Sequence, residues 1–281
     1  MTTVATAARQ ALPADPIRLL AFAAVLAAIN GVSTTIFASF EGFGWRGALL
    51  DLSGVSAVYW FALYALVTLS RASPTMDAAV EARTADRWVA ALVMALALWP
   101  SARAGAVGVL ISALYLARCD DPRARPIAVI LFALSGMLVV GQLLLVFAGP
   151  ALLTLDARFV ALLAGVESSG TTVRFTGHDG LFAIAVPCSS VHNVSLAVIL
   201  WASLTQLLGF RVTPRLIGLC GAAMATMVLV NGVRLAAIAH YHGSFDWLHV
   251  GGGAQLFGWA SLVAAGLVIA GGLLLLRDER A

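Results

Sequence analysis

The sequence contains no lysine and few charged residues of any kind. Only 11% of its 281 residues are charged, while 61% are hydrophobic, and the mean hydropathy is +0.95. Soluble globular proteins have about 25% charged residues. The chain also has repeated apolar stretches, several of them close to the ~20 residues that a spanning helix needs. The composition therefore excludes an ordinary soluble domain and predicts a polytopic helical membrane protein.

Because the sequence has no lysine, all 17 of its basic residues are arginine. With 14 acidic residues, the net charge is +3. These arginines cluster in the short polar segments beside the apolar stretches, where they mark membrane topology. A nucleic-acid partner is therefore not expected. The expected surroundings of the chain are the lipid bilayer.

Eight apolar segments divide the chain: 17–40, 52–70, 88–100, 104–117, 127–149, 189–208, 216–240 and 254–276. The first is too long for the apolar core of a cleavable signal peptide and predicts a spanning helix. Segments 88–100 and 104–117 are short because the sequence from Trp99 to Arg103 interrupts them. They are either two thin spans or one re-entrant hairpin. The predicted fold class is an all-α polytopic membrane protein with about eight transmembrane helices.

The arginines predict which side of the membrane each loop occupies, because basic residues are enriched on the cytoplasmic side. With the N-terminus inside, twelve arginines are inside and four are outside. The inner set is Arg9, Arg18, Arg71, Arg83, Arg87, Arg118, Arg123, Arg125, Arg211, Arg215, Arg277 and Arg280; the outer set is Arg46, Arg103, Arg158 and Arg174. Both termini are therefore predicted to be cytoplasmic.

Residues 150–188 are the one sizeable segment outside the apolar stretches, and they are predicted on the outer face. Leu152 to Val166 has the helical spacing of an amphipathic interfacial helix. Residues 171–176 and 181–186 flank a Gly-His-Asp-Gly turn and predict a β-hairpin. The chain thus divides into an N-terminal membrane bundle (1–149), this outer-face insertion (150–188) and C-terminal membrane helices (189–281).

Cysteine is scarce, with three residues in all, and the predicted topology separates them. Cys188 lies at the outer end of segment 189–208, whereas Cys119 and Cys220 lie toward the inner side. An intramolecular disulfide to Cys188 is therefore excluded. An unpaired thiol on the oxidising side of the membrane is prone to oxidation, so its presence there favours a functional role. The alternative is that Cys188 is a small apolar residue beside a helix start.

Other reactive residue types are predicted at the same depth as Cys188. Asn231 and Arg234 come late in the segment that runs outward, and His249 precedes the last segment. An arginine in a span costs about 2.5–3.5 kcal/mol on insertion scales, unless it extends to the lipid headgroups. Asn231 is three residues from Arg234 on one helical face and is expected to help hold the guanidinium.

These residues form the parts of a cysteine acyl-transfer site. His249 would take the thiol proton and return it to the leaving amine, and Arg234 would stabilise the thiolate or the oxyanion. The thiol is expected at the start of a helix, whose dipole favours thiolate. Ser189 is a candidate cap of that helix. His192, expected one helical turn beyond Cys188, is a rival base.

Two other functions remain open. His240, His242 and His249, with Asp246 nearby, are candidate metal ligands of a metal-dependent intramembrane hydrolase. A non-enzymatic transporter or assembly subunit would instead need polar groups near the middle of the membrane or internal repeats. No such repeat is seen, and the polar groups are concentrated on one side.

The residues also resemble a known family. Cys-Ser at 188–189, Asn-x-x-Arg at 231–234 and His249 before the last apolar segment resemble the exosortase/archaeosortase family in order and sidedness. The resemblance covers about residues 150–275. Family members commonly have Cys-Ser-Gly, whereas Ser190 replaces the glycine here, and the Gly251-Gly252-Gly253 run is also distinctive.

The resemblance implies an integral membrane cysteine transpeptidase of the prokaryotic inner membrane, with its site on the outer face. Cys188 would be the nucleophile, Arg234 the oxyanion stabiliser and His249 the acid/base. The implied partners are exported proteins that carry a C-terminal sorting signal with a transmembrane helix. No cofactor or metal is implied, and the oligomeric state, the sorting motif and the acceptor are left open.

Overall fold

The computed structural model describes residues 15–71, 83–177, 179–277 and 280, so Arg9 lies outside the described residues. Most of the described chain is helical. Within it, four helices are long and apolar enough to cross a membrane, or five if one bent pair counts as a single span. This is consistent with an all-α, multi-pass membrane protein. It does not confirm the predicted count of eight transmembrane helices.

The N-terminal half consists of short helices. They are α1 (Pro16–Gly31), α2 (Ser33–Leu50), the 3₁₀ turn η1 (Leu52–Gly54), α3 (Ala57–Arg71), α4 (Thr84–Leu98) and α5 (Ala102–Leu116). The predicted spanning helix over 17–40 is broken in the structure, although α1 and α2 together remain a candidate for one span. Val32 leaves the helical conformation (φ −113°, ψ 11°), and α1 and α2 meet at a bend of 49°. Helices α3, α4 and α5 have 15 residues each, about 22 Å at 1.5 Å per residue, which is shorter than the ~30 Å hydrocarbon core.

Small residues let α1 and α5 approach closely. Ala23, Ala24, Ala27 and Ala28 of α1 are fully buried. A Cβ added at Gly105 of α5 would lie 2.5 Å from the Ala27 carbonyl oxygen and 2.5 Å from the Gly31 nitrogen. Helices that pack in membranes commonly use such small residues, because apolar side chains gain nothing by leaving lipid.

The turn between α4 and α5 falls at residues 99–101, where the sequence predicts a break. The Asn30 amide nitrogen lies 2.8–3.2 Å from the carbonyl oxygens of Leu96, Trp99 and Ser101. An amide nitrogen has two hydrogens, so it shares them among these three acceptors. A polar side chain of α1 thus holds the end of α4 and the turn that follows.

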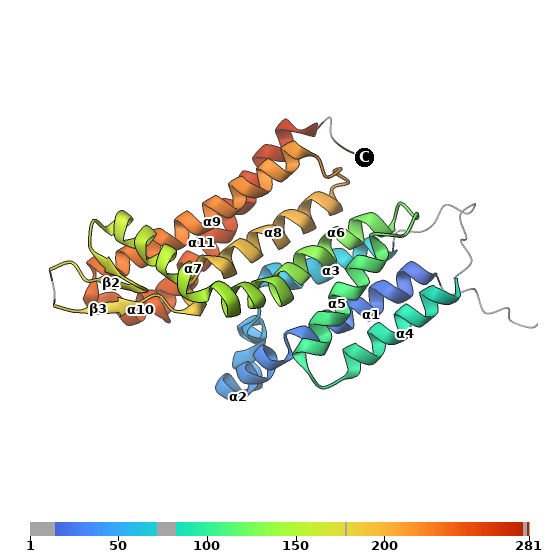
Figure 1. The fold of residues 1–281 in the computed structure, drawn as a ribbon, viewed down its shortest axis with the longest axis horizontal. Helices are drawn as coiled ribbons and strands as arrows, with labels where there is room; N and C mark the ends of the chain where they lie inside the picture. Colours follow the sequence, from blue (N-terminus) through green and yellow to red (C-terminus); the bar gives the residue numbers. More distant parts are fainter. Residues whose placement is uncertain (1–14, 72–82, 178, 278–279, 281) are drawn as a thin grey trace, which may run out of the picture.

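The next helices form one continuous unit. Helix α6 (Ala124–Ser135), the π-turn η2 (Gly136–Val140) and α7 (Gly141–Ala164) together make a helix of 41 residues. The prediction of a separate interfacial helix over 152–166 is therefore wrong, because the chain stays helical through Pro150. Proline inside a helix removes a backbone hydrogen bond and bends the axis. Figure 1 shows the ribbon of α7 changing direction along its length.

A small antiparallel sheet follows α7. Its strands are β1 (Ser168–Ser169), β2 (Thr172–Arg174) and β3 (Leu181–Ala183), in the order β1-β2-β3. Val173 pairs with Phe182 in the register, and both side chains are buried. Phe175 packs on Phe182 with ring centroids 5.1 Å apart. The strands are shorter than the two predicted segments, and β1 adds a third strand.

The C-terminal half contains the longest separate helices. Its elements are the 3₁₀ turn η3 (Val186–Cys188), α8 (Ser190–Leu207), α9 (Pro214–His240), the 3₁₀ turn η4 (His242–Ser244), α10 (Phe245–His249) and α11 (Gly252–Leu275). Helices α8, α9 and α11 begin and end within two residues of the predicted segments. Helix α11 begins in the glycine run and packs closely on α10. A Cβ at Gly253 would lie 2.6 Å from the Trp247 ring, so only glycine fits there.

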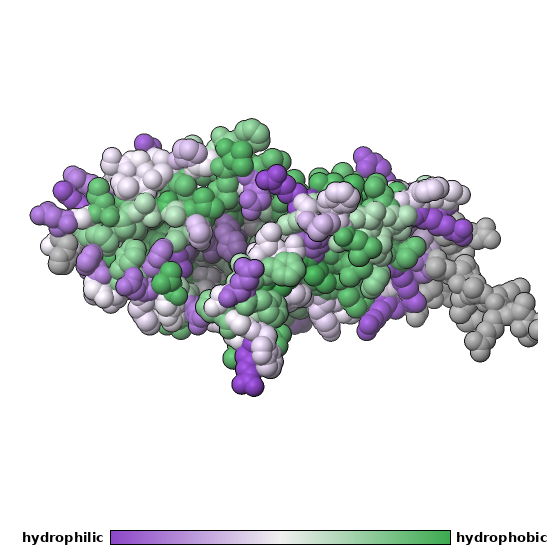
Figure 2. All heavy atoms as spheres, turned by 90° about the horizontal axis from the view of Figure 1, so that it is seen from below, coloured by the Kyte–Doolittle hydropathy of each residue, from purple (hydrophilic) through white to green (hydrophobic). Residues whose placement is uncertain are grey.

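The molecule has two ends of different chemistry. The sheet, η3 and α10 lie together at one end of the long axis, on the left of Figure 1, and we call this the sheet end. The opposite end, where α1 and α6 begin, we call the arginine end, and the contacts of Arg18, Arg71 and Arg123 lie there. Figure 2 shows hydrophobic residues over much of the visible face, with hydrophilic residues at the left end, toward the right and in smaller groups between them.

Hydrogen bonds and ion pairs join separate elements at the arginine end. Arg18 donates to the carbonyl oxygens of Ser70 and Arg71. Arg123 pairs with Asp15 at 2.7 Å and with Asp121 at 2.8 Å. The hydrogen bonds from Arg123 hold the pKa of the Asp121 carboxyl below its usual range. The starts of α1 and α6 and the end of α3 therefore meet at this end.

The close approach of α1 and α5 predicts the effect of a single methyl group. Gly105→Ala should destabilise the fold by about 1–3 kcal/mol, because the new Cβ forces two backbones apart. Gly221→Ala in α9 is the control, because its added Cβ meets no atom within 4 Å beyond the adjoining residues and backbone of its own helix. This control should gain about 0.5–1 kcal/mol from better helix propensity. Thermal unfolding of the full chain in detergent measures both, and equal melting temperatures would contradict the packing.

Candidate functional site

Cys188 lies at the sheet end, in the turn that joins β3 to α8. Its side chain is 7% exposed and belongs to an apolar cluster that includes Phe182, Ile184, Leu235 and Leu248. These neighbours come from β3 and the segment after it, from α9 and from α10. The cluster brings together parts of the chain that are far apart in sequence, and two of its members directly flank Arg234 and His249.

The expectation that Cys188 begins a helix is wrong. Cys188 ends the 3₁₀ turn η3, and Ser189 is extended (φ −71°, ψ 153°) at the N-cap of α8. Pro187 fixes its own φ and suits the start of a short turn. The thiol therefore precedes the first turn of α8. The expected stabilisation of its thiolate as the first residue of a helix does not apply.

Asn231 contacts the cysteine turn directly. It is 8% exposed in α9, and its Nδ2 donates to the Cys188 carbonyl oxygen at 3.0 Å. The sequence places Asn231 beside Arg234 as a partner of the guanidinium. In the structure, its amide hydrogen goes instead to the backbone of the residue that carries the thiol.

Arg234 is half-buried in α9, one residue before Leu235 of the Cys188 cluster. Its Nε is buried and has no hydrogen-bond acceptor among the residues that the structure describes. A buried N–H without an acceptor is unfavourable in the protein alone.

The histidines at this end make separate contacts. His249 ends α10, is half-buried, and stacks on Phe245 with ring centroids 5.0 Å apart. Nδ1 of His240 lies 3.1 Å from Thr176 Oγ1, and His242 packs edge-on against Phe175 at 4.7 Å. Across the described ranges, no three His, Cys, Asp or Glu side chains are grouped to hold a metal ion. The metal-ligand alternative gains no support.

His192 does not have the predicted relation to Cys188. Helix α8 starts at Ser190, and His192 lies in its first turn. Cys188 lies outside the helix, and the four-residue helical spacing between the two residues does not exist. The physical reason is again the extended Ser189, which turns the backbone between them.

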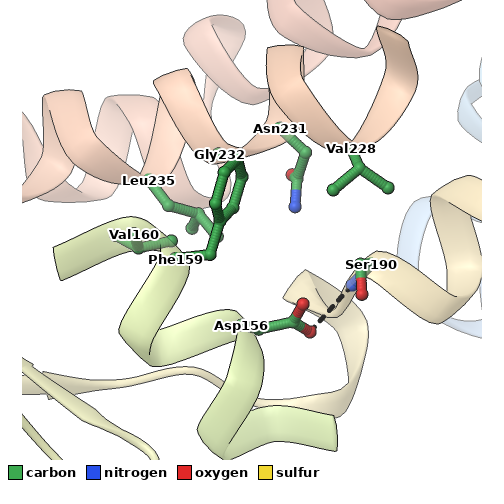
Figure 3. A pocket seen from close by; sticks show the side chains of 8 residues that line it. All are labelled: Asp156, Phe159, Val160, Ser190, Val228, Asn231, Gly232 and Leu235. Atoms are coloured by element: carbon green, nitrogen blue, oxygen red, sulfur yellow. Dashed lines mark hydrogen bonds between the residues drawn. The ribbon is translucent and has the colours of Figure 1, made fainter. Parts of the chain in front are cut away.

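Asp156 is a site residue that the sequence analysis missed. It lies in α7, is 9% exposed, and its Oδ2 accepts the backbone N–H of Ser190 at 2.9 Å (Figure 3). Its signal in the sequence is isolation, since it is the single acidic residue between Asp121 and Glu167. A carboxyl in such an apolar stretch is expensive and usually functional.

A small cavity separates Asp156 from Asn231. Its volume is about 10 Å³, close to the minimum that holds one water molecule. Figure 3 shows both side chains pointing toward the space between α7, α8 and α9. The lining residues are Asp156, Phe159, Val160, Ser190, Val228, Asn231, Gly232 and Leu235. A Cβ at Gly232 would lie 2.5 Å from the Phe159 ring, so glycine permits this packing.

The arrangement can hold a thiol in a defined turn, with a guanidinium and an imidazole on flanking elements. Ser189, between the two held backbone groups, is fully buried, and its Oγ has no partner among the described residues. No family model matches the chain, and no curated protein or solved structure is detectably similar to it. The chemistry of these residues is therefore the basis for any functional assignment.

The hydrogen bond from Asn231 predicts a change in thiol reactivity. Asn231→Leu should release the Cys188 carbonyl and raise the rate of Cys188 alkylation roughly fivefold, as expected for the loss of ~1 kcal/mol of local stability. The measurement uses iodoacetamide and a chain whose other cysteines are replaced by alanine.

Asn30→Leu is the matched control, because it removes an amide that binds carbonyls in the N-terminal half. Its alkylation rate should equal that of the unsubstituted chain at a temperature well below unfolding. An unchanged rate in Asn231→Leu would show that the bond does not restrain the turn.

Proposed function

We propose that this protein is a membrane cysteine protease or transpeptidase that resembles the exosortase/archaeosortase family. The observation that supports it best is the cluster at the sheet end. Cys188 belongs to one apolar cluster with Leu235 and Leu248, which adjoin Arg234 and His249 in the sequence. Three residues that are distant in sequence, and suited to acyl transfer, thus lie on segments that contribute to the same cluster.

In the proposed reaction, His249 removes the proton of the Cys188 thiol. The sulfur attacks the carbonyl carbon of the scissile peptide and forms a C–S bond, and the negative charge moves to the carbonyl oxygen. Arg234 donates to that oxyanion, a role suited to its unpartnered buried Nε. His249 then protonates the amine as the C–N bond breaks, which leaves a thioester on Cys188.

The second half of the reaction frees the enzyme. An amine or a water molecule gives a proton to His249 and attacks the thioester carbonyl. The C–S bond breaks, the thiolate regains the proton, and the product is a new amide or a carboxylic acid. An amine acceptor makes the protein a transpeptidase, and water makes it a protease.

The proposed substrates are exported proteins with a C-terminal transmembrane sorting signal. Several apolar helices are consistent with a multi-pass membrane protein, in which a substrate helix would lie beside them in the bilayer. We place the protein in a prokaryotic inner membrane with both termini cytoplasmic and the site on the outer face. The separation of the arginine end from the sheet end supports this orientation.

The proposal predicts a set of unprocessed C-termini in the native host. With Cys188→Ala at wild-type abundance, exported proteins should keep their C-terminal hydrophobic tails, and mass spectrometry of C-terminal peptides should detect them. Cys220→Ala, which removes a different buried thiol, should leave processing intact. Normal loss of the tails in Cys188→Ala would overturn the proposal.

Arg234 predicts a second, graded effect. Arg234→Gln should slow tail removal by about 10²–10³-fold, as for loss of one oxyanion donor. Arg174→Gln is the control, because Arg174 lies in the same sheet end but is exposed and pairs with Glu167 at 3.4 Å. Pulse-labelled substrate measures both half-times, and equal half-times would show that Arg234 stabilises no charge in the reaction.

A further inference from the structure

Two side chains from different helices hold the backbone on either side of Ser189. Asn231 of α9 donates to the Cys188 carbonyl oxygen at 3.0 Å, and Asp156 of α7 accepts the Ser190 N–H at 2.9 Å. In Figure 3, Asp156 and Asn231 project from α7 and α9 toward the same space. The turn that carries the thiol is therefore fixed from both sides.

The local sequence offers a simpler cap that the structure does not use. Ser189 occupies the N-cap position of α8, where a serine hydroxyl commonly accepts an N–H of the first turn. Its side chain makes no capping hydrogen bond, and its Oγ has no partner within the described part of the chain. Such a cap would in any case bind the N–H of Val191 or His192 and leave the Ser190 N–H without a partner. A carboxyl 34 residues away accepts the Ser190 N–H.

Asp156 also lacks the usual compensation for a buried acid. Its side chain is 9% exposed, and none of the ion pairs found among the described residues includes it. The compensation that it has is the Ser190 N–H and the positive end of the α8 dipole. Burial of this acid thus fixes the start of α8 against α7, next to Cys188.

We infer that Asp156 is a positioning residue for Cys188, acting through the backbone of Ser190. The role in the reaction rests on the proposed function, whereas the restraint on the turn does not. When the substrate binds, the sulfur must lie in line with the scissile carbonyl, and a small displacement lowers the rate strongly. Asp156 and Asn231 together prevent that displacement.

The test uses the full chain with Asp156→Ala, Asp156→Asn and Thr213→Ala. Asparagine keeps a side-chain oxygen that can accept the Ser190 N–H, and alanine does not. Thr213→Ala removes the side-chain cap of α9, which accepts from Leu216 N at 3.2 Å at the other end of the bundle. Each of the two alanine variants removes a side-chain acceptor from a helix start, the charged one of Asp156 or the neutral one of Thr213.

The first readout is amide hydrogen exchange at residues 186–192 in detergent, which needs no substrate. Asp156→Ala should speed exchange at Ser190 at least tenfold, as for loss of a hydrogen bond to a charged group. Asp156→Asn should restore slow exchange, and Thr213→Ala should leave it unchanged. Unchanged exchange in Asp156→Ala would overturn the inference.

The second readout is the half-time of tail removal for host proteins whose processing depends on Cys188. Asp156→Ala should lengthen it about 10- to 100-fold, and Asp156→Asn should bring it within about threefold of wild type. Fast exchange at Ser190 with normal processing would make Asp156 a helix cap alone and overturn the positioning role. If Cys188→Ala processes normally, the proposed function fails, and the exchange result still decides whether Asp156 restrains the turn.

Discussion

A backbone that begins a helix inside an apolar bundle must find hydrogen-bond partners within the protein, and the turn at Cys188 depends on this constraint. Helix α8 starts among α7 and α9, where its first N–H groups have no helical acceptor. Asp156 accepts the Ser190 N–H, and Asn231 donates to the carbonyl of Cys188. The side chains that satisfy the backbone also determine where the thiol lies. The same two hydrogen bonds therefore satisfy the backbone and fix the position of the candidate nucleophile.

The rest of the fold keeps that turn at one end of the molecule. Small residues let α1 and α5 pack closely in the N-terminal half, and Gly232 lets α9 pack against Phe159 of α7 near the cavity. Arginine contacts join helix ends at the opposite end, as in the pair of Arg123 with Asp15. The molecule therefore has one end built on arginine and another that gathers the sheet, the thiol and the histidines. This polarity agrees with the proposed reaction on one side of a membrane.

Apolar length and flanking charge were sufficient to predict the helices 189–208, 216–240 and 254–276, and Pro100 marked the break between α4 and α5. Hydropathy could not show that the chain bends at Val32, because both helices on either side are apolar. It also suggested an end at Pro150, where the helix in fact continues. The residues of the cysteine turn were predicted, but not their contacts. Whether Cys188 enters the helix depends on the backbone of Ser189, and the bond from Asp156 joins residues 34 apart, which no local pattern reveals.

Sidedness is the most direct test of the central claim that the thiol and the arginine end lie on opposite sides of a membrane. The measurement is thiol labelling of intact spheroplasts with a small, positively charged methanethiosulfonate, in chains that keep either Cys188 or Cys119 as the single cysteine. Cys119 follows α5 in the loop before Arg123 and is half-exposed, so it reports on the arginine end. Cys188 should react from outside, slowly because it is buried, and Cys119 should react only after the membrane is opened. Labelling of both thiols from the same side, or of Cys119 alone from outside, would contradict the account.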